Sequence, residues 1–278
     1  MNWRPDQHEY KVERLYGTGA ERLENYHDGY LNFGLWTPPV KTYLEAAENL
    51  VLTMARKLEL NAQSKVIDVA SGMGAQDILL VKNVGCHITS VEVTRKHVDQ
   101  ALRRIQAAHM SDRIDARFGT AVSLPFPDES FTHALCVEGT QHFNTRLDFL
   151  HEAYRVLKPG GKICVSDYAL TSFPKKFWQK HLINLAARLW CVPKVNFGTP
   201  ATYLKTMQEV GFKNVTIESI GAQSIPGYVQ EAQRPDNLKQ QRRIRGFFPT
   251  LFGKAMDYSV LYAFNAGLID YLILTAEK

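Results

Sequence analysis

The chain has 278 residues, of which 45% are hydrophobic and 22% are charged, which is ordinary for a soluble globular protein of one to one and a half domains. Its net charge of +5 is mild, and the basic cluster at 239–245 is more typical of a solvated helix face than of a nucleic-acid-binding stripe. The four cysteines form no C-x-x-C pair, and no apolar run approaches about 18 residues. With no apolar signal peptide at the N-terminus, we expect a cytoplasmic protein without a disulfide frame, an integral membrane span or a nucleic-acid partner.

The first sixty residues are expected to form a cap over the core. A loop from Tyr26 to Trp36 is dense in aromatic residues and glycines, which favours a segment that contacts a ligand. An amphipathic helix is predicted from Val40 to Leu58, where apolar residues recur at spacings of three and four. In an alternative interpretation, Tyr30 and Trp36 only pack the cap onto the core.

The segment 66–74 is the most informative part of the sequence. A β-branched strand enters a turn that contains Gly72 and Gly74, and a helical pattern follows from Ala75 to Lys82. Glycines at these positions let the backbone turn sharply and approach a ligand closely, because they carry no Cβ. Asp77 stands where the third glycine of the dinucleotide fingerprint is required, and Asp68 precedes the turn on the strand. A cofactor other than a dinucleotide is therefore expected.

A second strand is predicted over 86–92, and it ends in an acid. Glu92 lies at about the offset from the glycine turn at which nucleotide-binding α/β proteins place a carboxylate on the ribose hydroxyls. A carboxylate can accept two hydrogen bonds from a vicinal diol. Thr94 is expected to cap a helix that runs to about Ala108. Taken alone, Glu92 could be an ordinary exposed strand end; its register with the turn favours ribose binding.

The same alternation of strands and helices continues to about residue 170. Further strands are predicted over 114–118, 131–137 and 162–166, with a helix from Thr145 to Leu157 between the last two. The helix is expected to stop at Lys158-Pro159-Gly160-Gly161, since proline and glycine do not continue it. Strands that alternate with helices of 10–15 residues predict right-handed βαβ units and a parallel sheet.

The acid-x-small-x-Gly-x-Gly pattern from Asp68 to Gly74 resembles motif I of the class I S-adenosylmethionine (SAM) methyltransferases. "LPFPDESF" (124–131) and "FLHEAYRVLKPGGKICVSD" (149–167) are similar to motifs of their small-molecule type, and the resemblance is close over 65–170. It implies SAM as cofactor and a doubly wound, Rossmann-like α/β sheet of seven strands, the last one antiparallel and inserted between the fifth and sixth. It implies a cofactor site formed by Asp68, Ala70, Gly72, Gly74, Glu92, Val93, Thr120, Ala121, Glu138, Tyr30 and Trp36.

Two positions depart from the family pattern. Ala70 replaces the first glycine of the fullest motif I, a small-for-small change that should still admit the methionine moiety. Thr120 stands where many relatives carry the aspartate expected near the adenine amino group. A threonine hydroxyl accepts that hydrogen bond more weakly than a carboxylate does. Adenine binding is therefore expected to depend more on the backbone, Ala121 and Leu124.

The region after residue 170 is expected to form an inserted lid of helices and to complete the sheet. Helices are predicted over 173–191 and 199–210, and a long excursion over 224–265 precedes a last strand over 268–275. The many aromatic and aliphatic residues favour a lipophilic pocket, with Trp178 and Phe248 as candidate substrate contacts. Alternatively, they only bury the lid on the core. The expected divisions are 1–60 for the cap, 61–170 for the SAM-binding core and 171–278 for the lid with the last strands.

The loop after the fourth strand contains the candidate catalytic residues. A hydroxyl nucleophile needs a base near neutral pH, and "VEGTQHF" (137–143) resembles the E-x-x-x-H-F sequence of relatives that act on natural products and lipids. His142 is the candidate base, with a structural or cofactor-contact role as the alternative. Glu138 could orient His142, contact the methionine amino group or stabilise a substrate cation. Tyr30, Asp167 and Tyr168 are further candidate substrate contacts.

These features predict a SAM-dependent methyltransferase that acts on an oxygen or carbon of a lipophilic small molecule of the natural-product or prenyl-lipid kind. N-methylation of a small amine is an alternative, and a cyclase or regulator that keeps the SAM fold without methyl transfer is a rival of another class. Base-modifying methyltransferases carry Asn/Asp-Pro-Pro-Tyr/Phe after the fourth strand, whereas this chain does not. No metal is expected, since the histidines show no ligand spacing. The oligomeric state is left open.

Overall fold

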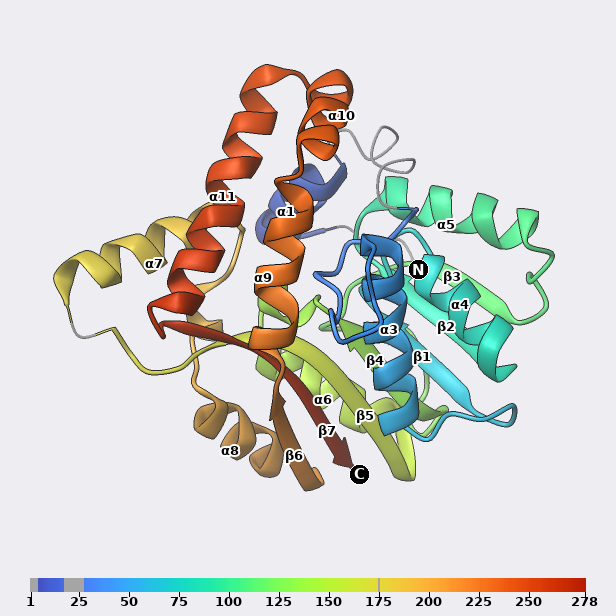
Figure 1. The fold of residues 1–278 in the computed structure, drawn as a ribbon. Coiled ribbons are helices and arrows are strands. Elements are labelled where there is room, and N and C mark those ends of the chain that lie inside the picture. Colours follow the sequence, from blue (N-terminus) through green and yellow to red (C-terminus); the bar gives the residue numbers. More distant parts are fainter. Residues whose placement is uncertain (1–4, 18–27, 175) are drawn as a thin grey trace.

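A seven-stranded sheet forms the centre of the molecule (Figure 1). The computed structural model describes residues 5–17, 28–174 and 176–278. The strand order is β3-β2-β1-β4-β5-β7-β6, and β7 is antiparallel to both of its neighbours. The strands are β1 Lys65–Val69, β2 His87–Glu92, β3 Ile114–Phe118, β4 Phe131–Val137, β5 Leu157–Leu170, β6 Lys213–Ser219 and β7 Ile269–Glu277. The predicted fold class is confirmed.

Helices cover both faces of the sheet and extend beyond one end of it (Figure 1). Those of the cap and core are α1 Gln7–Gly17, α3 Tyr43–Lys57, α4 Ala75–Val84, α5 Arg95–Ala107, the 3-10 turn η1 Thr140–His142 and α6 Arg146–Val156. Those of the C-terminal part are α7 Phe177–Leu189, η2 Lys194–Asn196, α8 Pro200–Val210, α9 Gly221–Ala232, α10 Pro235–Arg245 and α11 Phe247–Asn265.

Two apolar clusters hold these layers together. One lies between the sheet and the face covered by α3, α4, α5 and α9, where Leu50, Met54 and Leu80 are fully buried. The other lies under α6 and α8 and contains Phe149 and Met207. Each fully buried side chain of this size contributes roughly 1.5–3 kcal/mol relative to an exposed one. The sheet is thereby clamped from both sides and can hold a site at its edge.

Local sequence signals explain several element boundaries. Thr42 and Glu45 form a capping box at the start of α3, and Thr145 and Asp148 form one at the start of α6. The strand predicted over 162–166 is longer in the structure, because the antiparallel partner β7 pairs with it from Lys162 to Leu170. The predicted excursion over 224–265 corresponds to α9, α10 and α11.

The order in which strands are added to the sheet reverses at β1, because β2 pairs with one edge of β1 and β4 pairs with the other. In open α/β sheets, ligands bind at the carboxyl ends of the strands at such a point. The aromatic loop of the cap precedes α3, and its described part, 28–36, lies near this edge. Tyr26 and His27 of the same loop lie outside the described residues. The division into 1–60, 61–170 and 171–278 stays a prediction.

Candidate active site

A cavity of about 910 Å³ lies at the carboxyl ends of the parallel strands. Its floor is formed by the glycine turn and the ends of β2, β4 and β5, and its walls by α1, α7 and α11. Of the candidate site residues, the structure brings these to the cavity: Ala70, Gly72, Glu92, Val93, Thr120, Ala121, Glu138, His142 and Tyr168. Residues that lie up to about a hundred positions apart in the sequence therefore line the same cavity.

The turn after β1 adopts a left-handed backbone at three positions. Ala70, Gly72 and Gly74 have φ values of 65°, 60° and 78°. Gly74 touches α5, because a Cβ there would lie 2.9 Å from the Cβ of Ala101. At Gly72 a Cβ would meet only Leu31, at 3.6 Å, and would otherwise project into the cavity. Gly74 thus serves helix packing, whereas Gly72 keeps a space open for a ligand.

Asp68 lies beneath this turn and does not line the cavity. Its Oδ2 accepts a hydrogen bond of 2.5 Å from the Nε2 of Gln76, and the carboxyl of Asp77 lies beside it. Burial raises the pKa of both aspartates, and the charge of Asp68 raises that of Asp77 further. The buried pair ties the end of β1 to the first turn of α4. Its position favours a supporting role for Asp68 behind the turn.

Glu92 faces the cavity from the end of β2. Its Oε2 accepts a hydrogen bond of 3.1 Å from the backbone N–H of Gly72, and its Oε1 accepts one of 2.8 Å from that of Thr94. Burial by itself would raise the pKa of Glu92, but contacts with His97 and Thr94 outweigh it and lower the pKa below its usual value. The carboxylate is therefore ionised, and it is fixed to the glycine turn.

Glu92→Ala should weaken SAM binding by roughly 1.5–3 kcal/mol, the scale of hydrogen bonds to a charged group. Titration calorimetry with SAM measures the effect, and circular dichroism verifies the fold. Asp115→Ala, which removes an exposed acid from the neighbouring β3, is the matched control and should leave the affinity unchanged. If both variants bound SAM with equal affinity, Glu92 would be an ordinary acid at the end of a strand, without a role in SAM binding.

The helix α1 closes one side of the cavity, a contact that the sequence did not predict. Glu9 accepts a hydrogen bond from the hydroxyl of Thr120, and both residues line the cavity. The Nε2 of His8 lies 2.8 Å from the carbonyl oxygen of His142. A carboxylate therefore does stand beside position 120, although it comes from another part of the chain.

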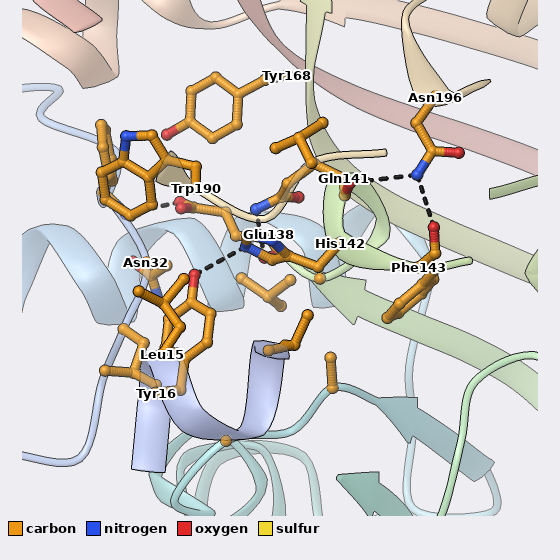
Figure 2. Close-up of a pocket in the computed structure, with 18 of the residues that line it drawn as sticks. Leu15, Tyr16, Asn32, Glu138, Gln141, His142, Phe143, Tyr168, Trp190 and Asn196 are labelled. Atoms are coloured by element: carbon orange, nitrogen blue, oxygen red, sulfur yellow. Dashed lines mark hydrogen bonds between the residues drawn. The ribbon is translucent and has the colours of Figure 1, made fainter. Parts of the chain in front are cut away.

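His142 is buried at the end of η1. Its Nε2 lies 2.8 Å from the hydroxyl of Tyr16, and the two rings meet edge to face (Figure 2). Burial lowers the pKa of His142 to about 4, although the nearby backbone of Cys191 and Trp190 acts in the opposite direction. Burial also raises the pKa of Tyr16, so that its hydroxyl keeps the proton. At neutral pH the site therefore contains a neutral imidazole beside a neutral phenol.

Glu138 is held in place by the cap loop and by β7. Its Oε1 accepts hydrogen bonds of 2.6 Å from the backbone N–H of Phe33 and from the hydroxyl of Tyr271. Burial raises the pKa of Glu138 to about 7, and the hydrogen bond from Tyr271 limits that rise. The Glu138 carboxyl therefore titrates closer to neutral pH than an ordinary glutamate does. A carboxyl poised in this way can accept or donate a proton.

Asn196 holds the backbone on both sides of His142. Its side-chain amide donates hydrogen bonds to the carbonyl oxygens of Gln141 (3.2 Å) and Phe143 (2.7 Å) (Figure 2). The side-chain oxygen Oδ1 of Asn196 accepts a hydrogen bond of 2.9 Å from the backbone N–H of Arg146. The guanidinium of Arg146 pairs with the buried Asp167 at 2.6 Å, and burial still raises the pKa of Asp167. Asp167 is therefore engaged in a structural ion pair and does not line the cavity.

Asn196→Ala should lower the free energy of unfolding by roughly 1–3 kcal/mol, because it leaves buried backbone groups unpaired. Urea denaturation measures the change. Asn83→Ala removes an exposed amide that bonds only within α4, to the carbonyl of Leu79, and should cost far less. Equal losses would show that the Asn196 contacts add nothing to stability.

Several candidate contacts lie elsewhere. Tyr30 is buried against α4, with its hydroxyl 3.5 Å from the carbonyl oxygen of Ala75. Trp36 packs against Gly227 of α9, which agrees with the alternative that the cap aromatics serve packing. Trp178 and Phe248 are 48% and 79% exposed and do not line the cavity. The lid helices turn other residues inward: Leu182, Ile183, Ala186, Trp190, Phe252, Met256 and Val260.

The sequence analysis did not single out Glu9, Tyr16, Trp190 or Asn196 as site residues. The nearest signal was the surplus of aromatic residues in the lid, but it did not indicate which side of a helix faces inward. In the part of the chain that the structure describes, no group of three His, Cys, Asp or Glu side chains could hold a metal ion, and a metal-free site stays a prediction. No helix among the described residues is long and apolar enough to cross a bilayer.

Comparison with known proteins agrees with this architecture. Residues 67–165 match the family described as the methyltransferase domain. Erythromycin 3''-O-methyltransferase of Saccharopolyspora erythraea is 30% identical over 199 residues, which are 69% of this chain and 64% of that protein. The 27-O-demethylrifamycin SV methyltransferase of Amycolatopsis mediterranei is 27% identical over 276 residues, which are 96% of this chain and 97% of that protein.

A solved structure shares the whole fold. Geranyl diphosphate C-methyltransferase from Streptomyces coelicolor A3(2), in complex with S-adenosyl-L-homocysteine, superposes with a TM-score of 0.75 at 15% identity, covering 98% of each chain. Together with the glycine turn and the acid at the end of β2, the match over 67–165 shows that the chain contains the methyltransferase domain, and the protein is a SAM-dependent methyltransferase. Its cofactor is SAM.

Proposed function

We propose that the protein transfers the methyl group of SAM to a hydroxyl oxygen of a lipophilic small molecule, with His142 as the proton acceptor. The observation that carries this proposal is the buried, neutral imidazole of His142 in the wall of the cavity. A neutral imidazole carries one ring-nitrogen lone pair, and this nitrogen can accept the proton that a hydroxyl loses as it attacks. Tyr16 fixes the direction of Nε2 through its hydroxyl.

The residues at the floor of the cavity suit SAM. Gly72 leaves space that a Cβ would fill, and the ionised carboxylate of Glu92 is available for a diol. We propose that Val93, Thr120 and Ala121 contact the adenine side. SAM supplies an electrophilic methyl group when it is bound, and the protein holds the nucleophile in line with it. Glu9 would supply the carboxylate that position 120 lacks.

The apolar lid favours a lipophilic acceptor. The inward residues of α7 and α11 are mostly aliphatic or aromatic, and the cavity is large enough for a drug-sized ligand. The two relatives compared above are named for methylation of erythromycin and of 27-O-demethylrifamycin SV, and the first name specifies an oxygen. These names support an oxygen acceptor on a natural product. The acceptor itself stays unidentified.

Carbon or nitrogen methylation is the second candidate reaction. The protonation state of Glu138 is the property of the site that bears on it. A carboxylate that stabilises a substrate cation must be ionised, whereas burial raises the pKa of Glu138 to about 7. Because the raised pKa lies close to neutral pH, it favours proton transfer over cation binding. Glu138 is thus an alternative base for an acidic carbon or hydroxyl.

Incubation with methyl-labelled SAM and a host metabolite extract tests the proposal. We expect labelled products heavier than their precursors by one methylene, and fragmentation of these products should place the label on oxygen. A label on carbon or nitrogen would replace the proposed reaction with one of its alternatives. Specific SAM binding without any labelled product would favour a cyclase or regulator that keeps the fold.

A further inference from the structure

The helix α11 carries an apolar stripe on its solvent-exposed side. Exposed residues recur along it at spacings of three and four: Phe248, Leu251, Ala255, Tyr258 and Tyr262. The inward side of the same helix lines the cavity with Met256 and Val260. A helix that is apolar on both sides buries only one of them within this chain. The exposed stripe is therefore available to a partner.

Basic residues surround this stripe. Lys239, Arg242 and Arg243 are exposed on α10, which packs against α11. The guanidinium of Arg242 lies 5.1 Å from the ring centre of Phe247, and the ammonium of Lys254 lies 5.9 Å from that of Tyr258. Cationic groups and exposed aromatic rings therefore share one surface. We name this the α10–α11 surface; it consists of the stripe with Phe247, Lys239, Arg242, Arg243 and Lys254.

Charge is separated between the lid and the rest of the chain. The segments 171–194 and 237–256, which contain α7 and most of α10 and α11, carry ten Lys and Arg residues and no acid, and Asp236 of α10 and Asp257 of α11 border the second segment. The remaining residues carry 23 basic and 28 acidic ones. The helix α7 also exposes Phe177 and Trp178 between Lys176 and Lys180. Figure 1 shows α11 running between α10, at the top of the view, and α7, at its left.

This combination fits an anionic bilayer surface better than a second copy of the chain. Aromatic rings enter the interface between headgroups and acyl chains, while Lys and Arg attract anionic lipids. A two-fold dimer through the same surface would place the cations of both copies against one another. An acidic protein would satisfy the charges, but it would leave the exposed phenyl rings with less apolar surface to bury.

The lining of the cavity reaches solvent on α11 and α7. Phe252 and Leu189 line the cavity and are nevertheless 52% and 37% exposed, so a bound molecule can enter beside them. We propose that the α10–α11 surface docks on anionic membranes and that the acceptor enters the cavity directly from the bilayer. The entry step rests on the proposed function, because it assumes a lipophilic acceptor. The docking step does not.

Flotation of the full-length protein with lipid vesicles tests the docking. Vesicles of phosphatidylcholine with about one third phosphatidylglycerol, in about 0.15 M salt, should carry the protein upward, and pure phosphatidylcholine should carry far less. The double variants Phe248→Ser with Leu251→Ser, and Arg242→Glu with Arg243→Glu, should each lower the partition coefficient at least about tenfold. The mixture contains neither SAM nor an acceptor, so failure of docking and failure of methyl transfer are distinguishable.

The matched control changes Leu102 and Leu147 to serine. These leucines are exposed on α5 and α6, outside α7, α10 and α11, and their variant should bind as the wild type does. The proposal would be overturned if the Phe248/Leu251 variant and the control bound vesicles equally. It would also be overturned if vesicle binding by the wild type did not depend on lipid charge. A dimer that the Phe248/Leu251 variant dissociates would assign the surface to a second copy. Capture by poly-glutamate that persists in that variant, without vesicle binding, would assign it to an acidic protein.

Discussion

Replacing Gly72 by valine should abolish specific SAM binding. Gly72 has a φ of 60°, where a β-branched residue is strained, and its missing side chain faces the cavity. Among the described residues, a Cβ there would make one ordinary contact, with Leu31 at 3.6 Å. The valine side chain would therefore collide with the cofactor rather than with the fold. We expect the affinity to fall by more than about 100-fold, equivalent to about 2.8 kcal/mol, in titration calorimetry.

Gly160→Val is the matched control for this experiment. Gly160 has a φ of 74°, and no atom of the residues that the structure describes lies within 4 Å of a Cβ placed there. It does not line the cavity, so its variant carries the same backbone strain without blocking the cofactor. We expect reduced thermal stability and unchanged SAM affinity. If Gly72→Val bound SAM with unchanged affinity, the glycine turn would not be part of the cofactor site.

His142→Ala should lower kcat roughly 10²–10⁴-fold while SAM affinity stays the same. The alanine removes the group that accepts the hydroxyl proton, and the cofactor contacts proposed above do not include it. The sequence alone suggests an acidic limb of the pH profile near 6–7, the ordinary range of histidine. The structure revises that value, because burial lowers the pKa of His142 to about 4.

The pH dependence of kcat/KM distinguishes the two candidate bases. A base must be unprotonated, so activity is lost as the pH falls through its pKa in the free enzyme. With His142 as the base, the limb lies near pH 4 and disappears in His142→Ala. With Glu138 as the base, the limb lies near pH 7 and disappears in Glu138→Gln. Near-normal turnover of His142→Ala would transfer the role to Glu138.

The strands and the glycine turn were predictable because their signals are local. The β-branched run of β1, the two glycines and Glu92 lie within 27 positions of one another, and their pattern alone defines the sheet edge. The predicted ranges of β3 and β4 agree with the structure residue for residue. A short periodic segment determines its own strand, since alternate residues point to opposite faces.

The lid contacts were not predictable in the same way. Tyr16 and His142 are 126 positions apart, and Glu9 and Thr120 are 111 apart. No local pattern indicates which helix closes over which loop. The exposed Trp178 and Phe248 show a second limit, because an apolar residue near a cleft can point either way from its helix. The pKa of His142 likewise depends on burial by segments far away in the chain.

The alanine at position 70 limits what can occupy position 139. Ala70 holds a left-handed backbone that costs a non-glycine residue roughly 1–2 kcal/mol, and its methyl group occupies the space that a Cβ at Gly139 would need. Gly139→Ala is therefore disfavoured in this background. After Ala70→Gly the nearest obstacle is removed, and the tight neighbours that remain are the Sγ of Cys136 at 3.0 Å and the ring of Phe143 at 3.2 Å. The two positions are epistatic, so evolutionary or laboratory change in the loop after β4 has a preferred order that begins at residue 70.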